Sequence, residues 1–233
     1  MKTELSTFYL DIIETDVCQL SENDSRHAIK VLRFKKNDLI SVVNGKGIFG
    51  KGQIIEANPK KTKIKIIQTK KSKMPTYLGL AFCPLKSNER NSFIIEKATE
   101  IGVTDFYPII SQNSERRKWN ETKYEKILIA SLKQTGRHWL PNIHGIETYN
   151  SFISREELPN LKFLAHCKDR LKLNLKKLVD SSKHQIIVIG PEGDFTLEEI
   201  DKAVTNNFKM ISLGENRLRT ETACIVSLSV MKL

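Results

Sequence analysis

The chain has 233 residues, of which 39% are hydrophobic and 28% are charged, and its formal net charge is +11. This composition is typical of a globular protein and excludes a largely disordered chain. No apolar stretch approaches the length of a membrane span, and a secretory signal is excluded by the acidic residues near the start, Glu4, Asp11, Glu14 and Asp16. We therefore expect a cytoplasmic protein.

The first third of the chain carries the concentrated basic charge. Between Lys30 and Lys73, 13 residues are Lys or Arg and two are acidic. Such a stretch repels itself unless an anion is nearby. We favour an RNA backbone as that anion over a merely solvated lysine surface.

Residues 1–72 are predicted to form a small β domain. Turn signals at Asn44-Gly45 and Asn58-Pro59 separate three expected strands, 39–43, 52–55 and 63–67. The last of these alternates Lys and Ile, which predicts a basic face over an apolar core. Gly45-Lys-Gly47-Ile-Phe-Gly50 fits a dinucleotide-binding pattern, but the segment after it alternates like a strand. We therefore interpret it as a hairpin.

Beyond an expected linker at 70–75, strands alternate with helices. Strands are expected at 77–83, 105–110 and 162–167, and helices at 92–102 and 121–136. This alternation predicts an α/β domain over residues 73–233, with a mainly parallel sheet covered by helices on both faces.

Two hydrophobic runs near the end of the chain stop at glycine and pass into helices. Ile186–Ile189 leads into Gly190-Pro-Glu-Gly193-Asp-Phe-Thr196, and Met210–Leu213 leads into Gly214. Thr196 and Glu199 form a predicted capping box, and we expect Thr220 to cap the last helix. Such loops often only connect elements, but two from successive strands would lie side by side at one sheet edge, where α/β proteins bind ligands.

The chain resembles the RsmE family of SPOUT-class RNA methyltransferases. The resemblance rests on both glycine loops and on three further blocks, His27-Ala-Ile-Lys-Val-Leu-Arg33, Lys97-Ala-Thr-Glu-Ile-Gly102 and Lys133-Gln-Thr-Gly-Arg137 followed by Pro141. It implies methylation of uridine N3 in 16S ribosomal RNA with S-adenosylmethionine. It also implies a C-terminal trefoil knot, an N-terminal PUA-like β-barrel that holds RNA, a small ribosomal subunit as partner, and a homodimer.

By this resemblance, the methyl-donor pocket is lined by Gly190, Pro191, Glu192, Gly193, Leu213, Gly214, Leu218 and Arg219. Arg219 and Arg217 are the candidates for stabilising the charge that develops when N3 loses its proton. An ion pair with Glu215 or Glu221 is the structural alternative for these arginines. Glu192 and Glu221 are candidate bases, and Asp194 is one by position only.

The RNA contacts are assigned to basic residues in both parts of the chain, Arg33, Lys35, Lys36, Lys63, Lys65, Lys86, Arg90, Arg116 and Arg117. Arg116 and Arg117 lie beside Trp119, a combination that nucleic-acid surfaces often show, although a solvated loop explains it nearly as well. No metal site is predicted. The four cysteines, Cys18, Cys83, Cys167 and Cys224, are far apart and are interpreted as buried thiols.

Five scattered histidines give no catalytic spacing. His166, at a strand end, is either a cofactor contact or a structural histidine with satisfied hydrogen bonds, and we favour the second. Three residues depart from the family pattern: Asp194 replaces a frequent third glycine, Thr7 a frequent arginine, and Lys133 a frequent glutamate. These departures keep open a non-catalytic RNA-binding or ribosome-assembly factor, and more weakly another nucleotide-binding enzyme.

Overall fold

The computed structural model describes residues 5–13 and 16–233, so Glu4 and Glu14, used above against a secretory signal, lie outside it. Contacts group the chain into two compact units. One runs from the start to Pro75 and includes Ile129–Leu140, and the other comprises Thr76–Leu128 and Pro141–Leu233. The predicted division at residues 72 and 73 stays a prediction, and each unit is described separately.

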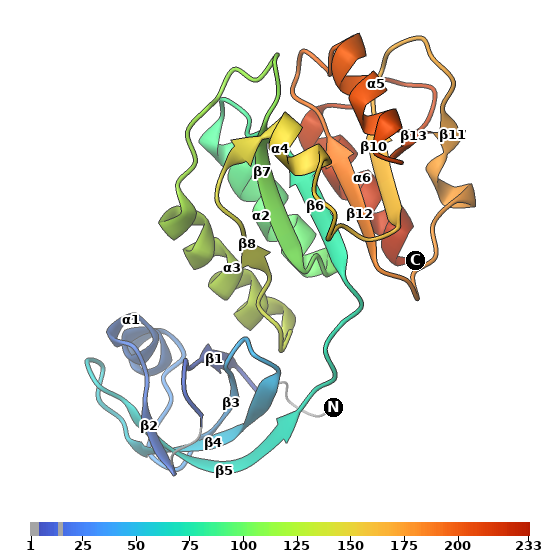
Figure 1. The fold of residues 1–233 in the computed structure, drawn as a ribbon. Coiled ribbons are helices and arrows are strands. Elements are labelled where there is room, and N and C mark those ends of the chain that lie inside the picture. Colours follow the sequence, from blue (N-terminus) through green and yellow to red (C-terminus); the bar gives the residue numbers. More distant parts are fainter. Residues whose placement is uncertain (1–4, 14–15) are drawn as a thin grey trace. The chain divides into compact units, whose positions relative to one another are not determined.

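The first unit is a five-stranded sheet in the order β1 (Thr7–Tyr9), β3 (Leu39–Val43), β4 (Ile48–Glu56), β5 (Lys63–Lys71) and β2 (Val17–Gln19) (Figure 1). The pair β1 and β3 is parallel, and the other pairs are antiparallel. A short helix α1 (Glu22–Arg26) continues into a π-helical turn (His27–Val31). The core of this unit is built on buried Ile40, Ile54 and Ile64.

The predicted alternation in β5 is confirmed. Ile64 is buried, whereas Lys65 is exposed and Lys63 is half-buried. The expected linker at 70–75 was placed too early, because β5 continues to Lys71 through its pairing with Phe49 and Ile48. Strand pairing at long range therefore extends a lysine-rich segment that local composition marks as a loop.

The glycine-rich segment at 45–50 is a hairpin between β3 and β4, as predicted. Gly45 and Gly47 have φ values of 67° and 88°, which favour glycine. A Cβ on Gly47 would overlap the indole ring of Trp139, whose Nε1 donates a hydrogen bond to the carbonyl of Lys73. These glycines therefore serve a hairpin and close packing of the chain on itself.

The second unit is built on a sheet whose strand pairs are all parallel. Its order is β11 (Leu173–Asn174), β13 (Lys209–Ser212), β10 (Leu161–Ala165), β12 (Gln185–Ile189), β6 (Leu78–Phe82), β7 (Asp105–Ile110) and β8 (Asn142–Ile143), and β9 (Glu147–Thr148) also pairs with β7. Every residue of β6 and β12 is buried, as expected for strands covered on both faces. The predicted mainly parallel sheet is confirmed.

Helices cover this sheet (Figure 1). Helix α2 (Asn88–Ile101) packs on α6 (Thr220–Lys232), while α4 (Tyr149–Ile153) packs on α5 (Leu197–Thr205). Helix α3 (Glu121–Thr135) begins in this unit and ends in the first, and a 3-10 turn (Leu175–Lys177) follows β11. Strands and helices enclose buried side chains including Leu164, Val188 and Phe195.

Side-chain caps mark the residues at which helices α2 and α5 begin. The capping box of α5 is confirmed, with the Thr196 hydroxyl accepting from the Glu199 amide and the Glu199 carboxylate accepting from the Thr196 amide. The predicted cap of α6 was wrong. Arg219 is the N-cap residue, and it makes no side-chain cap bond. Helix α2 begins four residues before its predicted start, because Ser87 caps it by accepting from the Arg90 amide.

Candidate functional site

Three loops meet at the carboxyl ends of β10, β12 and β13. Strand β10 lies between the other two, and Ala165 is in register with both Ile189 and Ile211. The glycine loops therefore flank His166 and Cys167, which follow β10, and are not direct neighbours as expected. The sequence missed this because strand order depends on pairing between distant segments. Such an edge is where α/β sheets bind ligands.

The two glycine loops are tied together across the end of β10. Arg217 donates from Nη2 to the carbonyl of Glu192 at 2.8 Å, and the hydroxyl of Thr220 donates to the carbonyl of Gly190 at 3.2 Å. Arg217 makes this contact in place of the alternative ion pair with Glu215 or Glu221. Arg217 thus holds the backbone of the neighbouring loop, and Thr220 does the same instead of capping α6.

The backbone conformation and hydrogen bonds of Asp194 explain how an aspartate can stand where the family often has a third glycine. Its φ is 61°, in the left-handed region that glycine, asparagine and aspartate visit. Its buried carboxylate accepts hydrogen bonds from the backbone amides of Cys167 at 2.9 Å and Phe195 at 2.8 Å. The aspartate therefore keeps the backbone turn and adds a link between the first glycine loop and the residues after β10.

The three loop glycines have different surroundings. A Cβ on Gly190 would lie 3.0 Å from the ring of Phe195, and one on Gly193 would lie 3.1 Å from Asn113. The side-chain amide of Asn113 also donates to the carbonyls of Gly193 and Asp194. Gly214 has a φ of 138°, and a Cβ there would meet no described atom within 4 Å. Only Gly214 therefore presents bare backbone to open space.

His166, which we interpreted as a structural histidine, is only 6% exposed. Burial lowers the pKa of His166, and the positive charges of Lys172 and Arg170 lower it further. The carboxylate of Asp194 and a backbone hydrogen bond with Lys168 oppose these effects. The pKa of the ring is therefore held below its usual value.

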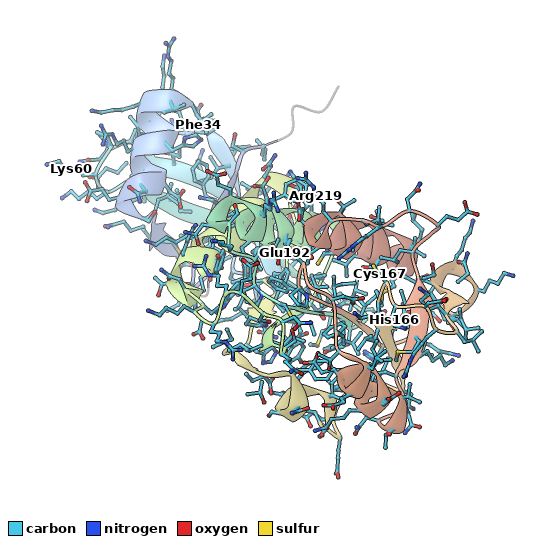
Figure 2. All side chains as sticks on the ribbon, turned by 90° about the horizontal axis from the view of Figure 1, so that it is seen from above. Phe34, Lys60, His166, Cys167, Glu192 and Arg219 are labelled. Atoms are coloured by element: carbon cyan, nitrogen blue, oxygen red, sulfur yellow. The ribbon has the colours of Figure 1, made fainter. Side chains whose placement is uncertain are left out.

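The remaining site candidates lie around these loops. Leu213 and Leu218 are half-buried, Pro191 is buried, and Glu192 and Arg219 are exposed. Figure 2 looks onto the carboxyl edge of the sheet, where labelled His166, Cys167, Glu192 and Arg219 fall over the same part of the second unit. The Arg219 guanidinium makes no hydrogen bond or ion pair with any other described residue, so it is available to a ligand.

Glu221 and Arg90 form an ion pair. The Glu221 carboxylate lies 3.5 Å from Nε of Arg90, and its side chain is 14% exposed. The candidate base Glu221 is therefore already paired with Arg90, which was predicted to contact RNA. Asp194, a candidate base by position only, already accepts hydrogen bonds from two backbone amides.

The basic candidates divide between the two units. In the first, Arg33, Lys35, Lys36 and Lys65 are exposed, while Lys63 pairs with Glu56 at 2.8 Å. In the second, Lys86 and Arg117 are exposed, and Arg116 donates to the carbonyls of Lys86 and Lys118. Lys133, the third departure, forms an ion pair with Asp24 at 2.7 Å inside the first unit.

A groove with a volume of about 520 Å³ opens at the carboxyl end of β7. The first turn of α5 lines it, and Glu199 in that turn accepts a hydrogen bond from the amide of Gln112, which also lines it, at 2.8 Å. Arg117 and Lys202 line it together with Glu198. No local pattern predicts this groove, because its walls come from four separated segments.

Within 5–13 and 16–233, no cluster of His, Cys, Asp and Glu could hold a metal ion. No helix in that part of the chain is long and apolar enough to cross a membrane. Three of the cysteines are buried as expected, but Cys167 is exposed because it lies in the loop after β10.

Known proteins match the whole architecture. An RNA methyltransferase domain model matches residues 72–232, and an RNA methyltransferase PUA domain model matches 20–67. Ribosomal RNA small subunit methyltransferase E of Buchnera aphidicola is 30% identical over 91% of this chain and 86% of its own length.

Solved structures agree with that match. A probable rRNA-methyltransferase of Porphyromonas gingivalis has a TM-score of 0.89 at 30% identity, covering 96% of this chain and 95% of the other. The S-adenosylmethionine-bound small subunit methyltransferase E of Neisseria gonorrhoeae has a TM-score of 0.86 at 26% identity, covering 98% and 97%. The predicted parallel-sheet domain with a PUA-like domain is confirmed, while the knot stays a prediction. The chain belongs to the ribosomal RNA small subunit methyltransferase E family of RNA methyltransferases.

Proposed function

We propose that this chain transfers the methyl group of S-adenosylmethionine to N3 of a uridine in 16S ribosomal RNA. The observation that supports it best is the hydrogen-bonded set of loops after β10, β12 and β13, with bare backbone at Gly214. The Neisseria relative, of nearly the same fold, is a structure with S-adenosylmethionine bound.

The residues of these loops fit such a donor. When bound, S-adenosylmethionine supplies an electrophilic methyl group on a positively charged sulfur. The half-buried side chains of Leu213 and Leu218 offer an apolar wall, and the backbone of Gly214 can approach a ligand closely. Gly190, Pro191, Glu192, Gly193 and Arg219 complete the proposed set.

Arg219 is the residue that we assign to the reaction itself. Uridine N3 carries a proton, and its loss leaves negative charge on the neighbouring carbonyl oxygens. The exposed guanidinium of Arg219 makes no hydrogen bond or ion pair with another described residue, so it is free to donate to those oxygens. We assign Arg217 to positioning, because it already holds the Glu192 carbonyl. Glu221 holds Arg90 and is a weaker candidate for the base.

Charge supports the RNA substrate. The first unit contains the whole basic stretch between Lys30 and Lys73, and its exposed residues Arg33, Lys36 and Lys65 can contact phosphates. We propose the small ribosomal subunit as partner, a homodimer as the active form, and a role in ribosome biogenesis in the cytoplasm. The alternative of a non-catalytic factor draws no support from Asp194, because that residue preserves the turn.

The direct test is transfer of a deuterated methyl group. Full-length protein is incubated with S-adenosylmethionine carrying a CD3 group and small ribosomal subunits from cells that lack the modification, and the RNA nucleosides are analysed by mass spectrometry. The proposal predicts trideuterated 3-methyluridine. A label on another atom or nucleoside would refute the assigned position, and no label would favour the non-catalytic factor.

A matched pair of variants tests the site in the same assay. Arg219→Ala should slow transfer by about 10²–10³-fold, the usual cost of removing one preorganised donor. Lys209→Ala removes the same charge at the amino end of β13, the opposite edge of the sheet, and should leave the rate unchanged. Equal rates for both variants would remove Arg219 from the mechanism.

A further inference from the structure

The outer face of the sheet in the first unit carries a line of lysines. Strands β1, β3, β4 and β5 are neighbours in this sheet (Figure 1). Because successive residues of a strand point to opposite faces, the buried side chains of Ile40, Ile54 and Ile64 mark the inner face. The strand registers then place three rows on the outer face, which are Tyr9, Val43, Phe49 and Lys70, then Thr7, Ser41, Lys51 and Gln68, and then Leu39, Gln53 and Lys65. None of the residues in these rows is acidic.

The spacing of these lysines suits an extended anion. Lys51, Lys65 and Lys70 are exposed, and none of them forms an ion pair with a described residue. Two rows correspond to about 14 Å along the strands, so the three charges follow the strands and do not surround one point. A chain of phosphates can meet each lysine separately. The charge of this face therefore favours a nucleic-acid strand over a single small anion.

An aromatic pair stands at one end of this line. The rings of Phe49 and His138 are stacked, with 3.7 Å between their centroids and 3° between their planes. Phe49 is directly opposite Lys70 on the neighbouring strand. Both ring residues are half-buried, so part of the stack faces solvent. Burial lowers the pKa of His138, so its ring is uncharged at neutral pH and stacks as an aromatic group.

The backbone around His138 is fixed by the β3–β4 hairpin. The carbonyl of His138 accepts a hydrogen bond from the amide of Gly47 at 2.9 Å, and the amide of Leu140 donates to the carbonyl of Gly45 at 2.8 Å. The indole of Trp139, between these two contacts, packs on Gly47. The stack is therefore formed before any ligand arrives, and a base that joins it loses little affinity to the ordering of side chains.

The combination of lysines and stacked rings selects one form of RNA. Proteins that bind single strands combine a basic track for the backbone with aromatic side chains on which bases stack. A base inside a duplex is already paired and stacked, so only an unpaired base is free to stack on a protein ring. An acidic protein segment would need the lysines alone.

We propose that the ring pair of Phe49 and His138 stacks on an unpaired base of the RNA substrate. Lys51, Lys65 and Lys70 contact the phosphates of the same single strand. This inference rests on the proposed function, because it takes RNA as the substrate, but it concerns recognition by the first unit and not the transfer of the methyl group.

Fluorescence anisotropy on the full-length protein tests the ring pair with two labelled probes of the same sequence, a single-stranded RNA and its duplex. Phe49→Leu keeps an apolar side chain but removes the ring, so it should weaken single-strand binding by about 10-fold and leave duplex binding unchanged. Phe49→Tyr keeps the ring and should bind as the wild type does. Phe93→Leu is the matched control, because Phe93 is an exposed phenylalanine of α2 in the second unit, and its binding should equal that of the wild type.

A second variant of the pair separates binding from folding. His138→Leu removes the other ring at a position outside the strands, and it should also weaken single-strand binding by about 10-fold. Circular dichroism without RNA should show the wild-type spectrum for both ring variants. Wild-type affinity of both variants for the single strand, or an equal loss for the single strand and the duplex, would overturn the inference.

Lys70→Ala tests the line of lysines in the same assay. It should reduce the slope of log affinity for the single strand against log salt by about 0.7, and an unchanged slope would overturn the phosphate contact. Methyl transfer to small ribosomal subunits is measured in parallel. Intact transfer by ring variants that bind the single strand as the wild type does would overturn this inference alone, whereas ring-dependent binding without transfer would overturn the proposed function alone.

Discussion

Replacing Asp194 with glycine keeps the backbone turn but removes the hydrogen bonds of the carboxylate, so it separates these two contributions. Glycine adopts its φ of 61° without strain, which returns about 1 kcal/mol, but the larger conformational freedom of unfolded glycine removes a similar amount. The loss of two hydrogen bonds from a buried carboxylate then decides the outcome. At about 1.5–3 kcal/mol for each bond to a charged group, we expect Asp194→Gly to lower the unfolding free energy by about 3 kcal/mol or more.

Urea denaturation measures this change directly. The midpoint should fall with the slope unchanged, and the melting temperature should drop by about 6–12 °C for a chain of this size. Asn207→Gly is the matched control, since Asn207 is exposed, has a φ of 62° and changes only the backbone term. That variant should stay within about 1 kcal/mol of the wild type. If Asp194→Gly is as stable as the wild type, the carboxylate does not join the loops.

Four further outcomes are expected. Arg217→Ala should weaken S-adenosylhomocysteine binding in calorimetry by about 3–10-fold, because the Glu192 carbonyl loses its partner; unchanged affinity would contradict this. Burial raises the pKa of Asp105, but hydrogen bonds from His144, Thr104 and Asn142 outweigh it and lower the pKa, so its stabilisation is present above the unfolded value of 3.8 and is lost as pH falls below it; in acid titrations by circular dichroism, Asp105→Asn should lack this loss. Gly47→Ala should destabilise the first unit by about 3 kcal/mol in urea denaturation, through backbone strain and the clash with the neighbouring indole, and an unchanged midpoint would refute the close packing. Lys65→Ala should reduce the slope of log affinity for RNA against log salt by about 0.7–0.9, whereas Lys63→Ala should change it less because its partner carboxylate offsets the charge; equal slopes for all three proteins would move the RNA surface elsewhere.

Local sequence patterns predicted most of the sheet. The apolar runs ending at Gly190 and Gly214 are strands followed by helices, and the capping box at Thr196 is present, because both signals depend on neighbours in the chain. Strands of two or three residues, such as β1, β8 and β11, carried no readable period. Their existence depends on pairing with longer strands.

The centre of the site was less accessible to prediction. Placing β10 between β12 and β13 requires knowledge of strand order, so the position of His166 between the two loops could not be derived. A lone histidine after a strand was the only signal, and a structural role was the more ordinary interpretation. Asp194 was recognised as a departure, but its bond to Cys167 joins residues 27 positions apart. The family resemblance supplied the chemistry, which no local pattern contained.

A crystal structure with S-adenosylhomocysteine tests the central claim most directly. Density for the ligand should lie among the loops that follow β10, β12 and β13, beside Gly214. Density in the groove at the carboxyl end of β7, or at no place in the second unit, would contradict the account.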